Sequence, residues 1–509
     1  MFTSLASQYI FLSAQVHKHP YLVITLLLLA LPLLLTYALS TYLFHRAIST
    51  AKTNAAANNG LASPTPALPY WIPFLGHTIS LVFETSRFMR RLASTYGNMP
   101  VKLYFMADTG LSREDQLRGE IDELSGVLPQ PNPGWEHLPD HKRWNLREHA
   151  VYGAHLSSSA QESILGARLA EGFTRDLLSW AAEHGEGWID VPDLTKFLRE
   201  NLFIAATSAL YEDELLGSIA PDLPKDYWDW LDQMPRLFRR LPRWMIPGAY
   251  AARERTLDSL MKWDEAKRRG GAPSKGQLEW DPLHGSTLTQ ARTVMFDEFG
   301  IGREGSALFH SAMLFALTPN ATYATIWALL HILREGPNLI SRVLAESAPY
   351  FQEPNSLSIR DTTELSRLPL LSSIFMETLR LRAASPVGRT PIDDTFYLSS
   401  PSPPLNIKWK LDKDVHIISS SWLGGHDASF WNEGPILAAS DKPAHPVDTF
   451  WAERFLEYPD DPFSGPVKKK NVVHTASLAN MKEKTSSGDK KAKLVTQGTS
   501  SHWFPLAGG

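Results

Sequence analysis

Apolar residues are unevenly distributed along the chain, and the longest uncharged run lies near its amino end. Residues 21–44, YLVITLLLLALPLLLTYALSTYLF, contain no charged side chain. As a helix rising 1.5 Å per residue, this run would be about 36 Å long, which is enough to cross a bilayer. A signal peptide would have a shorter apolar stretch and a small-residue cleavage site. The pattern therefore predicts a transmembrane anchor.

The flanks of this run predict the organisation of the rest of the chain. Lys18 precedes it and Arg46 and Lys52 follow it, so the positive-inside rule places the carboxyl-terminal body in the cytosol. Residues 45–69 are rich in Ala, Asn and Pro, which predicts a stiff, extended linker. The expected parts are a short amino-terminal segment (1–20), the anchor (21–44), the linker (45–69) and one large domain (70–509).

Beyond residue 70, apolar residues mostly recur three and four positions apart, the spacing of amphipathic helices. Such helices are expected at 160–183, 195–210, 227–237 and 251–269. Residues 305–334 form a longer, weakly charged run suited to a buried central helix, in which Pro319 should break the hydrogen-bond ladder. The expected sheet consists of short runs at 394–398, 406–411 and 415–420, and the polar residues 465–501 predict a loop. The predicted class is mainly α with a minor β-sheet.

Composition narrows the chemistry. The chain is 43% hydrophobic, so it can bury a large core. Its formal net charge of -4 gives no electrostatic reason for a nucleic-acid partner. The sequence contains no cysteine, which excludes disulfides, thiolate metal sites and cysteine nucleophiles among these residues. Its 17 histidines show no metal-ligand spacing, so no metal-ligating residue is assigned.

Common catalytic motifs are absent or accidental. Residues 300–305, GIGREG, match the dinucleotide-binding spacing, but neither a good preceding strand nor a suitably placed acidic residue accompanies them. We therefore interpret this run as a loop before the central helix. The sequence has no phosphate-binding P-loop, HExxH or GxSxG motif, which argues against phosphoryl transfer, zinc proteolysis and serine hydrolysis.

The most informative run is LSSIFMETLRLR, at residues 371–382. Glu377 and Arg380 are three residues apart and would share one helix face among apolar neighbours. A buried carboxylate needs complete pairing, and Arg454, within the aromatic run FWAERF, is the natural second partner. By composition alone, a solvated helix pair is an equally good interpretation.

These motifs resemble those of the cytochrome P-450 superfamily. ETLRLR at 377–382 is similar to its ExxR helix, and FWAERF at 450–455 is similar to its downstream ERF segment. PYWIPFLGH at 69–77 resembles the proline-rich segment that follows a membrane anchor in that family, and residues 420–435 resemble the stretch before ERF. The resemblance implies that Glu377, Arg380 and Arg454 form a structural triad beside a haem. Arg389 matches a position where the family often contacts a haem propionate.

The resemblance implies a haem-dependent monooxygenase, with the iron and haem as its cofactor, an apolar small molecule as substrate and an NADPH-dependent membrane reductase as partner. A single-pass location in the endoplasmic reticulum follows from the same resemblance. Asn320 and Thr322 would stand where most members carry an acid and an alcohol that deliver protons. Arg143 and Arg147 approximate a further haem contact, although Arg147 follows Trp144 one position too closely. The central helix and residues 69–77 look most like the branch of sterol 7-alpha-hydroxylases and prostacyclin synthase, with a fungal secondary-metabolism character.

One departure concerns the iron ligand. Residues 503–509, WFPLAGG, resemble the opening of the family's cysteine loop, and the sequence then stops shortly before the expected thiolate. We expect the carboxyl-terminal part of the fold to be missing. The alternatives that stay open are a non-catalytic, membrane-anchored relic with the same fold, and a redox-neutral peroxide isomerase of the same superfamily, suggested by Asn320.

Overall fold

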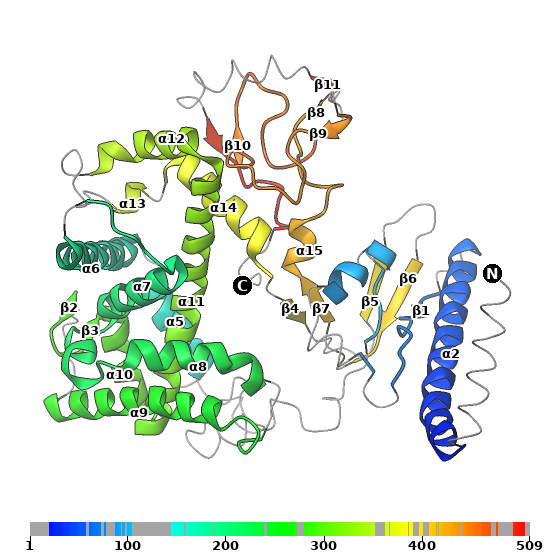
Figure 1. The fold of residues 1–509 in the computed structure, drawn as a ribbon, viewed down its shortest axis with the longest axis horizontal. Coiled ribbons are helices and arrows are strands. Elements are labelled where there is room, and N and C mark those ends of the chain that lie inside the picture. The colour runs from blue at the N-terminus through cyan, green and yellow to red at the C-terminus, as the bar shows by residue number, and fades with distance from the viewer. Residues whose placement is uncertain are drawn as a thin grey trace. The chain divides into compact units, whose positions relative to one another are not determined.

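The computed structural model describes most of the chain from residue 20 to residue 503. The main stretches outside the described part are residues 1–19, 58–60, 73–75, 78–86, 104–143, 239–241, 272–278, 352–361, 390–395, 401–406, 470–474, 477–491 and 504–509. The described residues are mainly helical with short strands, which confirms the predicted class (Figure 1). The chain divides into two compact units: residues 1–116 with 386–419, and residues 117–385 with 420–509.

The first unit combines one long helix with a small sheet. Helix α2 (Pro20–Ala56) contacts the strands β1 (Ser63–Pro64) and β6 (Ile407–Leu411). The strand order is β1-β6-β5, with β6 parallel to β1 and antiparallel to β5 (Phe396–Ser400). Trp409, at the centre of β6, is fully buried. The sheet therefore has one face that holds a core and a helix that packs on it.

Two expectations for this unit need correction. The extended linker expected from residue 45 is helical as far as Ala56, because residues 45–56 contain no Gly or Pro and one face of them packs on the sheet. The run 415–420 does not join the other two predicted strands. Its strand β7 (Ile417–Ser420) pairs with β4 (Pro386–Arg389) in a separate two-stranded sheet.

The second unit is built around α11 (Arg303–Glu335), which contains Pro319 and packs against α7, α9, α12 and α14. The helices predicted from periodicity are all present with slightly wider bounds. They are α6 (Ser159–His184), α7 (Leu194–Leu210), α8 (Leu223–Phe238) and α9 (Pro247–Gly270). Further helices are α5 (Trp144–His155), α10 (Thr287–Glu298), α12 (Pro337–Ser347), α13 (Thr362–Leu365), α14 (Pro369–Arg382) and α15 (Ser421–Gly425).

Short strands and single turns complete this unit. They are β2 (Trp280–Asp281), β3 (Gly285–Ser286), β8 (Ile436–Leu437), β9 (Lys442–Pro443), β10 (Leu456–Glu457), β11 (Thr475–Ala476) and β12 (Lys493–Leu494), with a π turn at Leu215–Ile219 and a 3-10 turn at Ala348–Tyr350. The predicted loop at 465–501 thus contributes two of these strands, although much of it lies outside the described residues.

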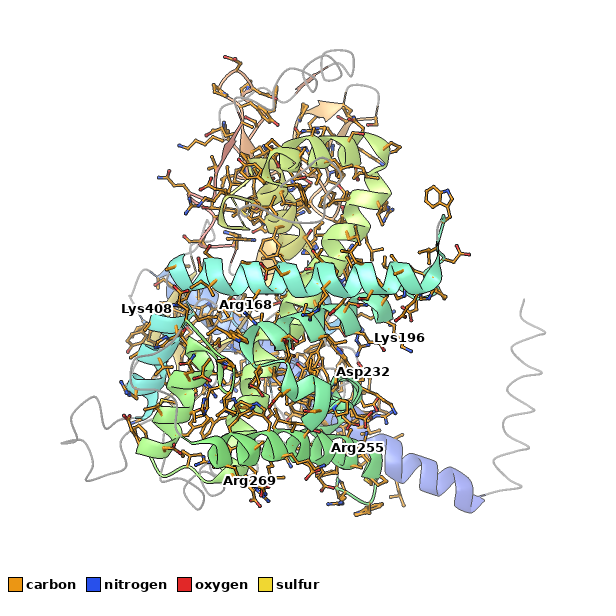
Figure 2. The ribbon with its side chains drawn as sticks, turned by 90° about the vertical axis from the view of Figure 1, so that its left-hand side faces the viewer. Arg168, Lys196, Asp232, Arg255, Arg269 and Lys408 are labelled. Atoms are coloured by element: carbon orange, nitrogen blue, oxygen red, sulfur yellow. The ribbon has the colours of Figure 1, made fainter. Side chains whose placement is uncertain are left out.

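The core of the second unit follows from the amphipathic pattern. Buried aromatic and aliphatic side chains of α7 to α11 form one cluster, and a smaller one joins α12 and α14 to residues 452–456. Charged side chains lie on the outer side of these helices, among them Lys196, Asp232, Arg255 and Arg269 (Figure 2). Within the described residues, α11 is the helix long and apolar enough to cross a membrane by length and composition, yet its contacts make it the central helix of this unit.

Candidate functional site

Helix α14 carries the predicted carboxylate and its first guanidinium. Pro369 occupies its first turn, where its missing N–H costs nothing. The Glu346 carboxylate accepts hydrogen bonds from the backbone N–H groups of Leu370 and Leu371, at 2.9 and 3.0 Å, and so satisfies donors that the helix start leaves free. The helix therefore has a fixed start, and Glu377 and Arg380 lie on one face near its end.

Glu377 and Arg380 form a two-point ion pair in the interior. Arg380 donates from Nε to Oε2 at 2.6 Å and from Nη2 to Oε1 at 2.8 Å, and neither side chain is exposed. Its Nη1 donates to the carbonyl groups of Gly425 and Val447, at 2.5 and 2.8 Å. Charge-assisted bonds of this kind are the strong ones, and they leave Arg380 little freedom to reorient.

Arg454 brings the second guanidinium to the same carboxylate. Its Nε lies 3.0 and 3.1 Å from the two oxygens of Glu377, and its remaining nitrogens donate to backbone carbonyl groups, including that of Asn432. Burial lowers the pKa of Arg454, and the charge of Glu377 opposes that effect. One anion and two cations are thus enclosed together, and the carbonyl dipoles balance the surplus positive charge.

Backbone contacts fix the segment that carries Arg454. The N–H of Trp451 donates to Glu377 Oε1 at 3.2 Å, and the N–H of Phe455 donates to Ser373 Oγ at 3.2 Å. Both acceptors belong to α14, so the segment 450–456 is tied to that helix at two points. The structure thus brings together the three residues that the sequence analysis grouped.

Helix α15 approaches the same cluster through two glycines. A Cβ atom on Gly425 would lie 2.4 Å from the carbonyl oxygen of Arg380, and one on Gly424 would lie 2.5 Å from that of His502. Residues with side chains cannot approach backbone that closely, so glycine is required at both positions. His502 also stacks on Phe430 with ring centroids 3.8 Å apart, which holds the carboxyl-terminal segment against this region.

The two residues expected to deliver protons do not share a face of α11. Asn320 is exposed, whereas Thr322 is 3% exposed. Asn320 shares its face with large apolar side chains that are also partly exposed, namely Tyr323, Trp327 and Leu330. A neighbouring hydroxyl, that of Thr318, lies 2.8 Å from the hydroxyl of Tyr227 and donates to the Leu314 carbonyl at 2.7 Å. Asn320 is therefore a polar group among these apolar side chains of α11.

The expected haem contacts are placed only in part. Arg143 lies outside the described residues, and for Arg389 the structure describes the backbone, in β4. Arg147 forms an ion pair with Glu298 at 3.3 Å. No group of three or more metal-ligating side chains occurs within the described residues, and the sequence has no cysteine. The chain supplies the scaffold that the motifs predicted, but these residues do not supply a thiolate for a haem iron.

A buried polar cluster escaped the sequence analysis. Lys267 of α9 lies 2.7 Å from Glu212, and both are 2–3% exposed. The indole N–H of Trp263 donates to the same carboxylate oxygen at 2.7 Å, and burial raises the pKa of Glu212. Nearby, fully buried His310 pairs with the Tyr211 hydroxyl at 3.0 Å. Lys and Glu separated by more than fifty residues give no local pattern, so only the fold reveals this pair.

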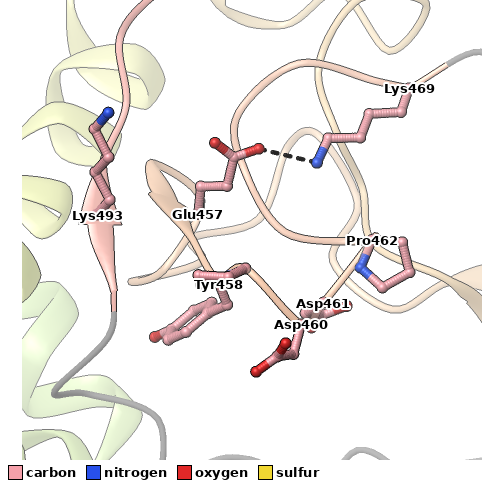
Figure 3. A pocket seen from close by; sticks show the side chains of 8 residues that line it. Glu457, Tyr458, Asp460, Asp461, Pro462, Lys469 and Lys493 are labelled. Carbon is pink, nitrogen blue, oxygen red and sulfur yellow. Dashed lines mark hydrogen bonds and ion pairs between the residues drawn. The ribbon is translucent and has the colours of Figure 1, made fainter.

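A surface hollow of about 420 Å³ lies beside β10 and β12 (Figure 3). Its lining includes Glu457, Asp460, Asp461, Lys469 and Lys493, and Lys469 pairs with Glu457 at 3.1 Å. A charged, open lining of this kind is unlike the enclosed apolar walls of small-molecule sites. We therefore do not assign a substrate to it.

The sequence was compared with family models and with curated proteins. No family model matches the chain. It is 27% identical to the cytochrome P450 monooxygenase efuG of Hormonema carpetanum, over 95% of this chain and 85% of that protein. It is 28% identical to the cytochrome P450 monooxygenase fsoE of Humicola fuscoatra, over 93% and 83%. Cytochrome P450 7A1 of Oryctolagus cuniculus is 28% identical over 33% of this chain and 32% of that protein.

Among solved structures, the retinoic-acid-bound cyanobacterial CYP120A1 aligns with a TM-score of 0.42 at 16% identity, covering 78% of this chain and 82% of that one. Both near full-length sequence matches are to proteins named as cytochrome P450 monooxygenases. The chain is thus similar to cytochrome P450 monooxygenases along nearly its whole length, which supports the superfamily indicated by the motifs. A haem cofactor is the expectation for that superfamily.

Proposed function

We propose that the protein is a membrane-anchored, haem-dependent monooxygenase that oxidises an apolar small molecule in secondary metabolism. The observation that carries this proposal is the enclosed ion cluster of Glu377, Arg380 and Arg454. It is supported by relatives that match nearly the whole length of the chain and are named as monooxygenases. Electrons would come from an NADPH-dependent membrane reductase. A cytosolic body at the endoplasmic reticulum would have access to that reductase and to apolar substrates in the membrane.

The apolar face of α11 supports an apolar substrate. Several large side chains, including Tyr323 and Trp327, are more than a third exposed there, although exposed apolar area of this kind is costly in water. Asn320 lies among these apolar side chains, and it can donate or accept a hydrogen bond. We propose that it orients substrate or a water molecule. Thr322 is buried on another face of α11, so its hydroxyl would not contact the same substrate or water molecule as Asn320.

We further propose that the haem is held near the triad, with Arg389, Arg143 and Arg147 as candidate partners for its carboxylates. A bound haem would supply oxygen activation in this superfamily, and the chain's own residues would position it and exclude water. These 509 residues contain no cysteine that could bind the iron as a thiolate. We also propose a relationship to the branch of sterol 7-alpha-hydroxylases and prostacyclin synthase, and the match to cytochrome P450 7A1 over 33% of this chain supports it.

The test is product formation in membranes that contain the protein, haem and a reductase. A panel of apolar small molecules is incubated with NADPH under ¹⁸O₂, and products are analysed by mass spectrometry. A monooxygenase leaves one labelled oxygen atom in the product. Product formed from an organic peroxide without reductase would favour the isomerase, while a protein that binds no haem and gives no product would favour the relic.

A further inference from the structure

The guanidinium group of Arg382 is held over an indole ring of α11. Arg382 is the last residue of α14, and its Cζ atom lies 3.8 Å from the centroid of the Trp327 ring. Its Nε donates to His331 Nε2 at 3.4 Å, and His331 stacks on Phe450 with ring centroids 4.3 Å apart. The contact with the indole and this hydrogen bond restrict the orientation of the guanidinium group. Its Nη1 and Nη2 atoms have no acceptor among the described residues, so they can donate to a ligand.

A second cation, Arg334, lies near Arg382. Both side chains are exposed, and neither forms an ion pair with an acidic side chain in the part of the chain that the structure describes. Burial lowers the pKa of Arg382, and the positive charge of Arg334 lowers it further. A negatively charged ligand would relieve the repulsion between these two cations.

The same chain contains an arginine–indole pair that is joined by a carboxylate. Arg199 of α7 lies over the ring of Trp228, with its Cζ 4.3 Å from the centroid, and its Nη2 is 2.8 Å from the carboxylate of Asp232. An arginine held over an indole can thus still present its outer nitrogens to a carboxylate. The pair of Arg382 and Trp327 has the same two members, and no described acidic side chain joins them.

The pair lies on the face of α11 that carries Asn320. Asn320 and Trp327 are seven residues apart, so they point in nearly the same direction and lie about 10 Å apart along the helix axis. Tyr323 and Leu330, on the same side of the helix, are 37 and 38% exposed and supply apolar surface. One face of α11 therefore combines a hydrogen-bonding amide, an apolar stretch and a cation farther along.

We propose that Arg382, held by Trp327, binds a carboxylate of the substrate, so that the substrate class is an apolar small molecule that carries a carboxylate. This inference rests on the proposed function and deepens it by naming a charged group on the substrate. The planar guanidinium can donate two parallel hydrogen bonds to a carboxylate, which a lysine cannot do. A haem also carries carboxylates, and the experiment separates these two sources.

Binding is measured on the full chain in nanodiscs by isothermal titration calorimetry, with the heat of empty nanodiscs subtracted. The probes are abietic, lithocholic and palmitic acid, each beside its methyl ester, which keeps the apolar body and removes the charge. At neutral pH, at least one acid should bind about tenfold more tightly than its ester.

Three variants assign this preference to the guanidinium group. Arg382→Gln should remove the difference between acid and ester. Arg382→Lys keeps the charge but loses the two-point geometry, so it should retain only part of the difference. The matched control, Arg199→Gln, removes an arginine that already pairs with Asp232, and it should keep the full difference.

The outcomes separate this inference from the proposed function. Equal dissociation constants for every acid and its ester would overturn the carboxylate site and leave an apolar substrate standing, as would an acid preference that survives in Arg382→Gln. Binding of neither acids nor esters would overturn both the carboxylate site and the apolar substrate. The titration is repeated with haem added in excess. A preserved acid preference supports the substrate carboxylate, whereas its loss would assign Arg382 to a carboxylate of haem and overturn the inference.

Discussion

At the scale of single residues, the carboxylate of Glu377 is the most consequential group. It is the anion that pairs with two guanidinium groups that have no access to water. Glu377→Gln keeps the shape but leaves those cations unbalanced. Removing one partner of a buried ion pair costs about 3–5 kcal/mol. We expect the free energy of unfolding to fall by that amount, as measured by denaturant titration.

A surface ion pair provides the control. Glu254 lies 2.6 Å from Arg243 with both side chains about half exposed. Because solvent screens such pairs, Glu254→Gln should cost no more than about 1 kcal/mol. Equal losses for the two variants would show that Glu377 is not the balancing charge of the cluster.

Gly425 makes a second prediction at this scale. Gly425→Ala would push a Cβ atom against the backbone carbonyl of Arg380, which cannot move without disturbing the ion pair. We expect a destabilisation of about 1–3 kcal/mol. In Gly153→Ala the added Cβ meets no atom within 4 Å and lies in a helix, so the variant should be neutral or slightly more stable. Thermal unfolding of both variants checks the contrast.

At the scale of elements, α8 is linked to α11 beside Pro319, through which α11 continues without the break expected from the sequence. The buried Tyr227 hydroxyl contacts Thr318 Oγ1 at 2.8 Å and donates to the Leu314 carbonyl at 3.2 Å. Tyr227→Phe and Thr318→Val should each cost about 1 kcal/mol, with a coupling energy in the double variant. Tyr323→Phe, whose ring is 37% exposed, should change little. Additive effects of the first two substitutions would contradict the link.

The helices and the triad could be predicted from the sequence because their signals are local. Apolar spacing marks α6, α7, α8 and α9, and two short motifs mark the ion cluster. The partner of β7 and the face occupied by Thr322 could not be predicted. Strand pairing depends on residues distant in sequence. Asn320 and Thr322 are two residues apart, so on a helix their side chains point in directions that differ by about 200°.

At the scale of the whole molecule, the buried histidines predict acid sensitivity. Burial lowers the pKa of His331 and of His445 to about 4, and lowers that of His310 as well. The cations that face them add to the effect: Arg382 and Arg334 at His331, Arg454 at His445, and Arg292 and Arg268 at His310. Glu377 partly opposes it at His331 and His445.

The sign of the effect follows from proton linkage. In an unfolded chain the pKa of histidine is about 6.5. Between that pH and the folded values, the unfolded state binds more protons, so acid favours unfolding. The contribution of these histidines to the free energy of unfolding is therefore fully present above about pH 6.5, and it is lost as the pH falls toward 4. Denaturant midpoints measured across this range should decrease steadily, and His445→Phe, which retains a ring to stack on Trp451, should decrease less steeply. Identical pH profiles for the two proteins would exclude His445 as a source of the acid sensitivity.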